Sequence, residues 1–309
     1  MKIIKIITMF GLLIFNLTSY SLAFANDKFS GSCIGDEIPQ NFDDYFNQVT
    51  PENAGKWGSV EKARNIYDWQ TLDNIYNYTK SNNYLYKHHT LIWGQQQPEW
   101  LNSLKANEQK KEIEEWIQLV CSRYPLVDMI DVVNEPINHP PLYKDAIGGS
   151  GTSGYDWIIW SFEKARQYCP NADLIINEYN ILNNSSNLKE LINIVKILKS
   201  KSLIDGIGIQ GHYFEIQNMS ADEINKSLDE LSLTGLSIYI SELEIDESDD
   251  AKQLDEYQRV FPVLWEHPSV YGITLWGYIQ GKIWKENGYL IRSDGSERPA
   301  FKWLIDYIY

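Results

Sequence analysis

The chain has 309 residues, 43% of them hydrophobic and 13% aromatic, and its formal net charge is −15 at pH 7. This length is enough for one large α/β barrel or for two ordinary domains. The acidity argues against a nucleic-acid partner or an anionic membrane, because the sequence has no basic patch that could neutralise phosphates.

Residues 1–25 have the features of a secretory signal peptide. Lysines give a charged start, the stretch at 6–15 is mostly apolar, and Ala23-Phe24-Ala25 forms a small-x-small exit. A membrane anchor is the alternative, but the apolar stretch is short for a bilayer span. We therefore predict cleavage after Ala25 and a secreted or periplasmic mature chain that is soluble and has no membrane contact.

The remaining segment, 26–309, shows no linker, no internal repeat and no shift in composition, which favours a single domain. It contains Cys33, Cys121 and Cys169, none of them in a metal-type spacing. An odd number of cysteines in an exported chain permits at most one internal disulfide and leaves at least one thiol.

Short runs rich in β-branched or aromatic residues alternate with helical patterns along this domain. The predicted strands are 33–35, 46–50, 84–91, 129–133, 173–176, 207–209, 236–240 and 270–275. Helical patterns include 108–124, 155–168, 187–201 and 221–231, the last preceded by Ser220 in a capping box. Eight such units in one chain predict a fold of the α/β class, a single (β/α)8 TIM barrel.

Nearly every predicted strand ends in polar or aromatic residues, and the loops after the strands form the active site of such a barrel. Two of these ends carry a glutamate after an apolar run: Glu135, preceded by Asn134, and Glu242. The other ends carry amide, imidazole and indole groups, which suit the hydroxyls and ring faces of a sugar polymer. One such glutamate could be a solvated loop acid or a helix cap, but the pair predicts glycoside hydrolysis.

Other chemistries have less support in the sequence. His88, His89 and His212 could be metal ligands, but no His-Glu-x-x-His spacing accompanies them. A serine nucleophile would lack its Gly-x-Ser-x-Gly elbow, and glycine-rich phosphate loops do not occur. We therefore expect no metal and no cofactor.

A retaining glycosidase uses one carboxylic acid to protonate the leaving oxygen and a second carboxylate, ~5–5.5 Å away, to attack the anomeric carbon. Glu135 is the predicted acid/base, because its neighbour Asn134 can hold the sugar 2-hydroxyl beside the reaction centre. Glu242 is the predicted nucleophile, kept ionised by hydrogen bonds from a group such as His212.

Five motifs resemble, in their order, those of the family 10 glycoside hydrolases, which are endo-β-1,4-xylanases. They are Thr-Pro-Glu-Asn-x-x-Lys-Trp at 50–57, His-Thr-Leu-x-Trp at 89–93, Asp-Val-Val-Asn-Glu at 131–135, Gly-Ile-Gly-x-Gln-x-His at 206–212 and Ile-Ser-Glu-Leu at 240–243. The resemblance covers essentially the whole mature chain. It implies a bacterial, secreted, monomeric enzyme that cleaves xylan or xylo-oligosaccharides with retention, using Glu135 as acid/base and Glu242 as nucleophile.

The same resemblance implies roles for residues around these glutamates. Asn134 binds the 2-hydroxyl, His212 hydrogen-bonds the nucleophile, and Tyr179 lies on the leaving-group side. Trp276 and Trp284 roof the sugar next to the scissile bond. Residues that match sugar sites around and on the non-reducing side of the cleavage point are Glu52, Asn53, Lys56, His89, Trp93, Gln96 and Gln210.

Three positions depart from the family pattern. Gly94 stands where a His commonly follows the Trp of the third strand end, Glu178 stands where Asp is frequent, and the loop at 277–282 lacks a common acidic pattern. These changes leave both glutamates in place but affect the contacts to the sugar rings. We interpret Glu178 and Glu244 as hydrogen-bonding groups beside the site, Trp57, Trp69, Trp116 and Trp265 as packing residues, and His88 as directed behind the barrel.

Two other functions stay open at this point. Paired glutamates recur in other barrel glycanases, so a cellulase-like enzyme is one alternative. The set Lys56, His89, Gln96 and Trp276 favours xylan, because by resemblance it leaves little room for the hydroxymethyl group of glucose. A sugar-binding protein without activity is the other alternative, and the intact glutamates argue against it.

Overall fold

The computed structural model describes residues 28–309, so the predicted signal peptide lies outside the described residues. Eight parallel strands close into one barrel in chain order. They are β1 (Phe29–Ile34), β2 (Gln48–Pro51), β3 (Leu85–Ile92), β4 (Met129–Asn134), β5 (Asp173–Glu178), β6 (Gly206–Ile209), β7 (Ser237–Leu243) and β8 (Val270–Leu275). The prediction of a (β/α)8 TIM barrel is confirmed.

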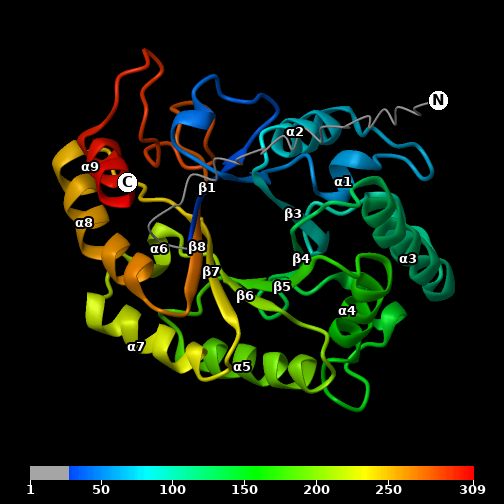
Figure 1. Cartoon of the computed structure of the whole chain (residues 1–309). Coiled ribbons are helices and arrows are strands. Elements are labelled where there is room, and N and C mark those ends of the chain that lie inside the picture. Colours follow the sequence, from blue (N-terminus) through cyan, green and yellow to red (C-terminus); the bar gives the residue numbers. More distant parts are fainter. Residues whose placement is uncertain (1–27) are drawn as a thin grey trace, which may run out of the picture.

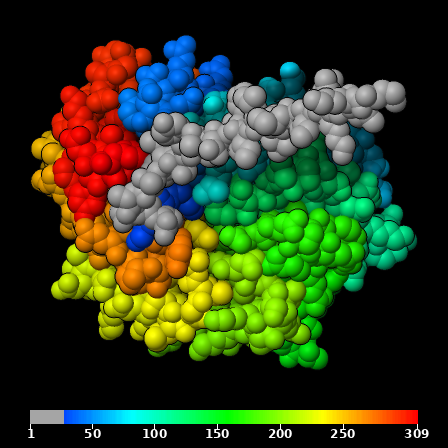
Figure 2. All heavy atoms as spheres, viewed as in Figure 1, coloured from blue at the N-terminus to red at the C-terminus, as the bar shows by residue number. Residues whose placement is uncertain are grey.

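Helices surround this barrel, as the view along the strands in Figure 1 shows. They are α1 (Trp57–Val60), α2 (Gln70–Ser81), α3 (Ala106–Arg123), α4 (Asp156–Tyr168), α5 (Ser185–Ser200), α6 (Tyr213–Ile216), α7 (Ala221–Ser232), α8 (Asp250–Glu266) and α9 (Pro299–Ile308), with 3-10 turns at Phe42–Asp44, Glu99–Ser103 and Leu142–Ile147. Figure 2 shows blue N-terminal residues beside the red C-terminal part on the outer surface. Inside, β1 pairs with β8, which closes the barrel.

The strands form where apolar residues run on without strict alternation, because both of their faces are buried. All six residues of β4 are buried, for example, between the barrel interior and the helices. Helix α7 begins at the signal expected from the sequence. Ser220 accepts a hydrogen bond from the Glu223 amide at 3.3 Å, and the Glu223 side chain accepts from the Ser220 amide at 2.8 Å, which confirms the predicted capping box of α7.

The layer between the strands and the outer helices holds the aromatic residues that the sequence assigned to packing. Trp116 stacks on Trp57 at 5.7 Å and on Trp69 at 5.7 Å. His88 lies in the same layer, fully buried and 6.4 Å from the ring of Trp116. These residues support the barrel from behind and do not line the cavity that holds both glutamates.

One disulfide joins Cys121 on α3 to Cys169 after α4, and Cys33 is a buried free thiol. This agrees with the limit of one internal disulfide and a leftover thiol. Within residues 28–309, no helix is long and apolar enough to cross a bilayer.

Candidate active site

The carboxyl ends of the strands meet around a cavity of about 380 Å³ that holds both glutamates. Glu135 follows β4 directly, and Glu242 is the penultimate residue of β7. All of the predicted site residues line this one cavity: Glu52, Asn53, Lys56, His89, Trp93, Gln96, Asn134, Glu135, Tyr179, Gln210, His212, Glu242, Trp276 and Trp284. Gln95, His139 and Phe214 line it too, and the sequence did not single them out.

Glu242 is held as a buried carboxylate. Its side chain accepts a hydrogen bond from Asn177 Nδ2 at 2.7 Å, and His212 Nε2 lies 3.3 Å from its other oxygen. Burial by itself would raise the pKa of this carboxyl, but the His212 hydrogen bond and the charges of His89, His212 and Lys87 outweigh burial and lower the pKa to about 2. Glu242 is therefore ionised at any pH well above 2, as a nucleophile requires.

His212 sits between two carboxylates. Its Nε2 faces Glu242, and its Nδ1 hydrogen-bonds Glu244, which is fully buried. Burial lowers the pKa of His212, but the charge of Glu244 and the hydrogen bonds to both glutamates raise it to about 10. Glu244 thus keeps the imidazole charged and oriented toward Glu242, in agreement with its interpretation as a hydrogen-bonding group.

Glu135 is buried and surrounded by hydrogen-bonding groups. Its Oε1 accepts from Gln210 Nε2 at 3.0 Å and from Asn134 Nδ2 at 3.4 Å. Its Oε2 accepts from Trp93 Nε1 at 3.0 Å and lies 2.6 Å from His139 Nδ1. The carboxyl is thus fixed from both sides without a permanent cation such as Lys or Arg among these partners.

Asn177 is a further residue at the site that the sequence did not single out. Its Nδ2 donates to Asn134 Oδ1 at 2.8 Å and to Glu242 at 2.7 Å, and Ser241 Oγ donates to its Oδ1 at 2.5 Å. One amide therefore connects the residue beside the first glutamate with the second glutamate. The available signal was its place near the carboxyl end of a predicted strand, the same signal that selected Asn134.

Lys56 is buried in the site and is not a surface lysine. Its Nζ donates to Gln96 Oε1 at 2.6 Å and to Asn53 Oδ1 at 3.1 Å, and it lies 5.0 Å from the centre of the Trp93 ring. Burial lowers the pKa of Lys56, although Glu242 and Glu52 counteract it, and burial raises the pKa of Glu52. This side of the cavity presents a compact set of donors and acceptors to a polar ligand.

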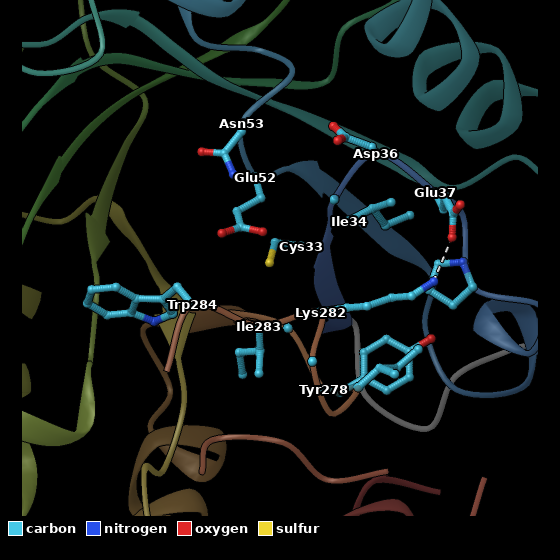
Figure 3. Close-up of a pocket in the computed structure, with 15 residues that line it drawn as sticks. Cys33, Ile34, Asp36, Glu37, Glu52, Asn53, Tyr278, Lys282, Ile283 and Trp284 are labelled. Atoms are coloured by element: carbon cyan, nitrogen blue, oxygen red, sulfur yellow. Dashed lines mark hydrogen bonds and ion pairs between the residues drawn. The ribbon is translucent and has the colours of Figure 1, made fainter. Parts of the chain in front are cut away.

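A second hollow, of about 450 Å³, continues past Glu52 and Asn53, and Trp284 lines both cavities. Figure 3 shows Glu52 and Asn53 on one side of this hollow, Trp284 and Ile283 on the other, and the ion pair of Lys282 with Glu37 at its far end. The two hollows form an elongated depression rather than a closed pocket.

Aromatic rings frame the reaction centre. Trp276 is buried and meets His89 edge to face at 5.2 Å, while His89 Nδ1 lies 2.9 Å from Asp131 Oδ2. Trp284, 46% exposed, lies 4.8 Å from the His212 ring. Flat apolar faces beside hydrogen-bonding groups are what a sugar ring needs.

Glu178 does not line the cavity that holds the two glutamates. It accepts hydrogen bonds from the Ile137 and Tyr179 amides at 2.8 and 2.9 Å and from Asn138 Nδ2 at 2.9 Å. Burial outweighs these bonds and raises its pKa to about 7. Glu178 therefore fixes the loop after β4, as expected of a supporting group. Among residues 28–309, no cluster of His, Cys, Asp and Glu could hold a metal ion.

Comparison with known proteins settles the family. A model described as glycosyl hydrolase family 10 matches residues 16–307. The chain belongs to glycosyl hydrolase family 10. The resemblance carried by the five sequence motifs is thereby confirmed.

Two curated relatives of this chain carry the name endo-1,4-beta-xylanase B. Endo-1,4-beta-xylanase B of Cellvibrio japonicus is 44% identical over 270 residues, 87% of this chain and 44% of the relative. Endo-1,4-beta-xylanase B of Thermotoga neapolitana is 29% identical over 77% of this chain and 72% of its own length. The chain thus spans less than half of the first relative and most of the second.

Solved structures share the fold. A family 10 structure from Paenibacillus barcinonensis superimposes with a TM-score of 0.81 at 23% identity, covering 92% of this chain and 96% of that chain. An intracellular xylanase from Thermoanaerobacterium saccharolyticum gives 0.78 at 26% identity, over 91% and 96%. A mutant of that xylanase, 25% identical over 90% and 95% with a TM-score of 0.78, was solved with xylotetraose.

Proposed function

We propose that this family 10 chain is an endo-1,4-β-xylanase that hydrolyses xylan with retention of configuration. The observation that carries the proposal is the contrast between two glutamates in one cleft. Glu242 is a buried carboxylate whose pKa is lowered to about 2. Glu135, in contrast, has no lysine or arginine among the hydrogen-bond partners of its side chain. Retaining glycosidases need this division between a nucleophile and an acid/base.

The proposed reaction runs in two steps. Glu242 attacks the anomeric carbon while Glu135 gives its proton to the glycosidic oxygen, so the C–O bond breaks and a glycosyl ester forms. Water then attacks the same carbon while Glu135 takes one of its protons, and the ester to Glu242 breaks. In this proposal Asn134, whose Oδ1 accepts a hydrogen bond from Asn177 Nδ2, binds the 2-hydroxyl in both steps.

Several observations support xylan as the substrate. Lys56, hydrogen-bonded to Gln96, and the buried Trp276 line the cavity, and by family resemblance this set leaves little room for an exocyclic hydroxymethyl group. The xylotetraose complex of the Thermoanaerobacterium relative and the names of the curated relatives point the same way. The second hollow next to Glu52 offers room for further sugar units, as endo-cleavage requires.

The purified chain is expected to hydrolyse xylan at least about tenfold faster than carboxymethyl cellulose. One unfavourable contact with a hydroxymethyl group costs about 1–3 kcal/mol in a fitted pocket, which corresponds to roughly 10- to 200-fold. Reducing-sugar release from the two polymers under the same conditions measures the ratio. Higher activity on the cellulose would instead assign a cellulase-like function, and no release from either would indicate a sugar-binding protein.

Trp276→Ala is expected to raise KM and lower kcat on xylan, reducing kcat/KM about 10- to 100-fold. A large apolar face fixes the sugar beside the bond that breaks, so its loss affects both binding and the position of the reacting carbon. Trp276→Phe keeps a smaller aromatic face and should lose less. Unchanged kinetics in Trp276→Ala, with an unchanged circular dichroism spectrum, would place this residue away from the reacting sugar.

We also propose that the protein works outside the cytoplasm, in the periplasm or secreted, after removal of residues 1–25. The disulfide between Cys121 and Cys169 supports this location, because such bonds persist in oxidising compartments. Edman sequencing of the protein recovered from the medium or periplasm tests the proposal, which expects Asn26 as the first residue.

A further inference from the structure

His139 makes the shortest hydrogen bond to the acid/base glutamate. Its Nδ1 lies 2.6 Å from Glu135 Oε2, whereas Trp93 Nε1 lies 3.0 Å from the same oxygen. The chain makes a helical turn directly after β4, in which the His139 amide donates to the Glu135 carbonyl at 2.8 Å. This turn places the two side chains, four residues apart, on the same side.

Gly94 makes room for this turn. The Gly94 amide donates to the His139 carbonyl at 3.1 Å, and a Cβ at position 94 would lie 2.2 Å from that oxygen and 2.8 Å from the Pro140 carbonyl oxygen. Any side chain at position 94 would therefore displace the backbone of residues 139 and 140. Where the family commonly has His, this chain has Gly94, which leaves space for the turn at 139. His139, from the loop after β4, contacts Glu135 instead.

The surroundings of Glu135 indicate which of its oxygens carries the proton. Oε1 faces the amide donors of Gln210 and Asn134, so it must act as an acceptor. Oε2 faces the indole N–H of Trp93 and also His139 Nδ1, which accepts a hydrogen bond when the neutral imidazole carries its proton on Nε2. A proton on Glu135 is therefore best placed on Oε2, between the carboxyl and the imidazole.

The imidazole is itself held and remains accessible to water. Its ring stacks on Tyr179 at 5.8 Å with an interplanar angle of 22°. Tyr179 in turn meets Phe214 edge to face at 6.0 Å. The His139 side chain is 39% exposed, so the ring connects the buried glutamate to solvent on the side of the cleft that holds Tyr179.

We propose that His139 is a positioning residue that holds the transferable proton of Glu135 on Oε2 until the glycosidic oxygen of the bound substrate takes it. This inference rests on the proposed function, in which Glu135 is the acid/base. The proton moves from Oε2 to the glycosidic oxygen in the first step and returns from water in the second. His139 therefore gains and loses no proton over the whole cycle.

The test compares two aryl β-xylobiosides, one with a dinitrophenolate leaving group that needs no proton and one with a phenolate that needs it. His139→Ala is expected to lower kcat/KM about tenfold on the phenyl substrate and on xylan, because one hydrogen bond is lost. On the dinitrophenyl substrate the loss should be less than about twofold, because its leaving group needs no proton. His139→Asn can restore a hydrogen-bonding group near Nδ1 and should recover part of the loss. Gly94→Ala, which displaces residue 139, should reproduce the selective loss.

Two controls separate the possible outcomes. Leu142→Ala, on the same loop and with a side chain 78% exposed, should behave like the wild type on both substrates. Glu135→Ala must itself show the selective loss, and if it does not, the proposed role of Glu135 fails. If Glu135→Ala shows it while His139→Ala has equal losses on both substrates, or none, only the role of His139 is overturned.

Discussion

Glu242→Ala is expected to lower kcat on xylan by about 10⁵-fold or more, the scale seen when a covalent nucleophile is removed from an enzyme. The covalent intermediate can no longer form, so an aryl xyloside with a good leaving group should not recover activity. Azide could at most attack the sugar directly and give a product of inverted configuration. Reducing-sugar release and product configuration measure both effects.

The matched control is Glu163→Ala on the solvent side of α4, which should keep wild-type activity. Because Glu242 accepts buried hydrogen bonds, its removal could also disturb His212 and Asn177. Glu242→Gln therefore serves as a second variant of nearly the same shape, and we expect it to be equally inactive. Appreciable xylan hydrolysis by either folded variant would exclude Glu242 as the nucleophile.

Glu135→Ala is expected to lower kcat/KM on xylan by about 10²- to 10⁴-fold, the usual contribution of a general acid. With a dinitrophenyl xyloside the first step needs no proton, so the glycosyl-enzyme should still form and accumulate. Added azide should then speed turnover, because it needs no base to attack the ester, and the product should be a β-glycosyl azide.

The two variants must therefore respond differently to azide. Rescue with retained β-configuration in Glu242→Ala, together with none in Glu135→Ala, would falsify the assignment and exchange the two roles. We expect the opposite: azide should rescue Glu135→Ala and should give no product of retained configuration in Glu242→Ala. The hydrogen bonds of the Glu135 carboxyl to Gln210, Trp93 and His139 support its role as acid/base.

The parts of this fold that the sequence predicted well are those with a strong local signal. The apolar run before Asn134 gave β4 to within one residue, and the strand-end polar groups led to one cavity. The first strand was predicted poorly, at 33–35, whereas β1 spans Phe29–Ile34. Its small residues give no β signal, and one of them, Gly31, lies so close to β2 that a Cβ on it would lie 1.9 Å from Gln48 Oε1. Such a cross-strand contact cannot be read from one segment.

The boundary of β7 shows a similar limit. The predicted strand ends at residue 240, but β7 continues to Leu243, with an irregular register against β8 between Ile240 and Leu243. Glu242 therefore lies within the strand and not after it. The contacts of Asn177 and His139 depend on side chains from three different strand ends, so local patterns could place these residues near the site but could not assign their partners.

The most direct test of the central claim, that Glu242 attacks the sugar, is to trap the covalent intermediate. A 2-deoxy-2-fluoro-β-xylobioside with a dinitrophenolate leaving group should form the ester quickly and hydrolyse slowly, because fluorine destabilises both transition states while the good leaving group offsets this only in the first. Mass spectrometry of proteolytic peptides should then find the fluorinated disaccharide on Glu242. A label on Glu135, or no label on an enzyme that still hydrolyses xylan, would contradict the account.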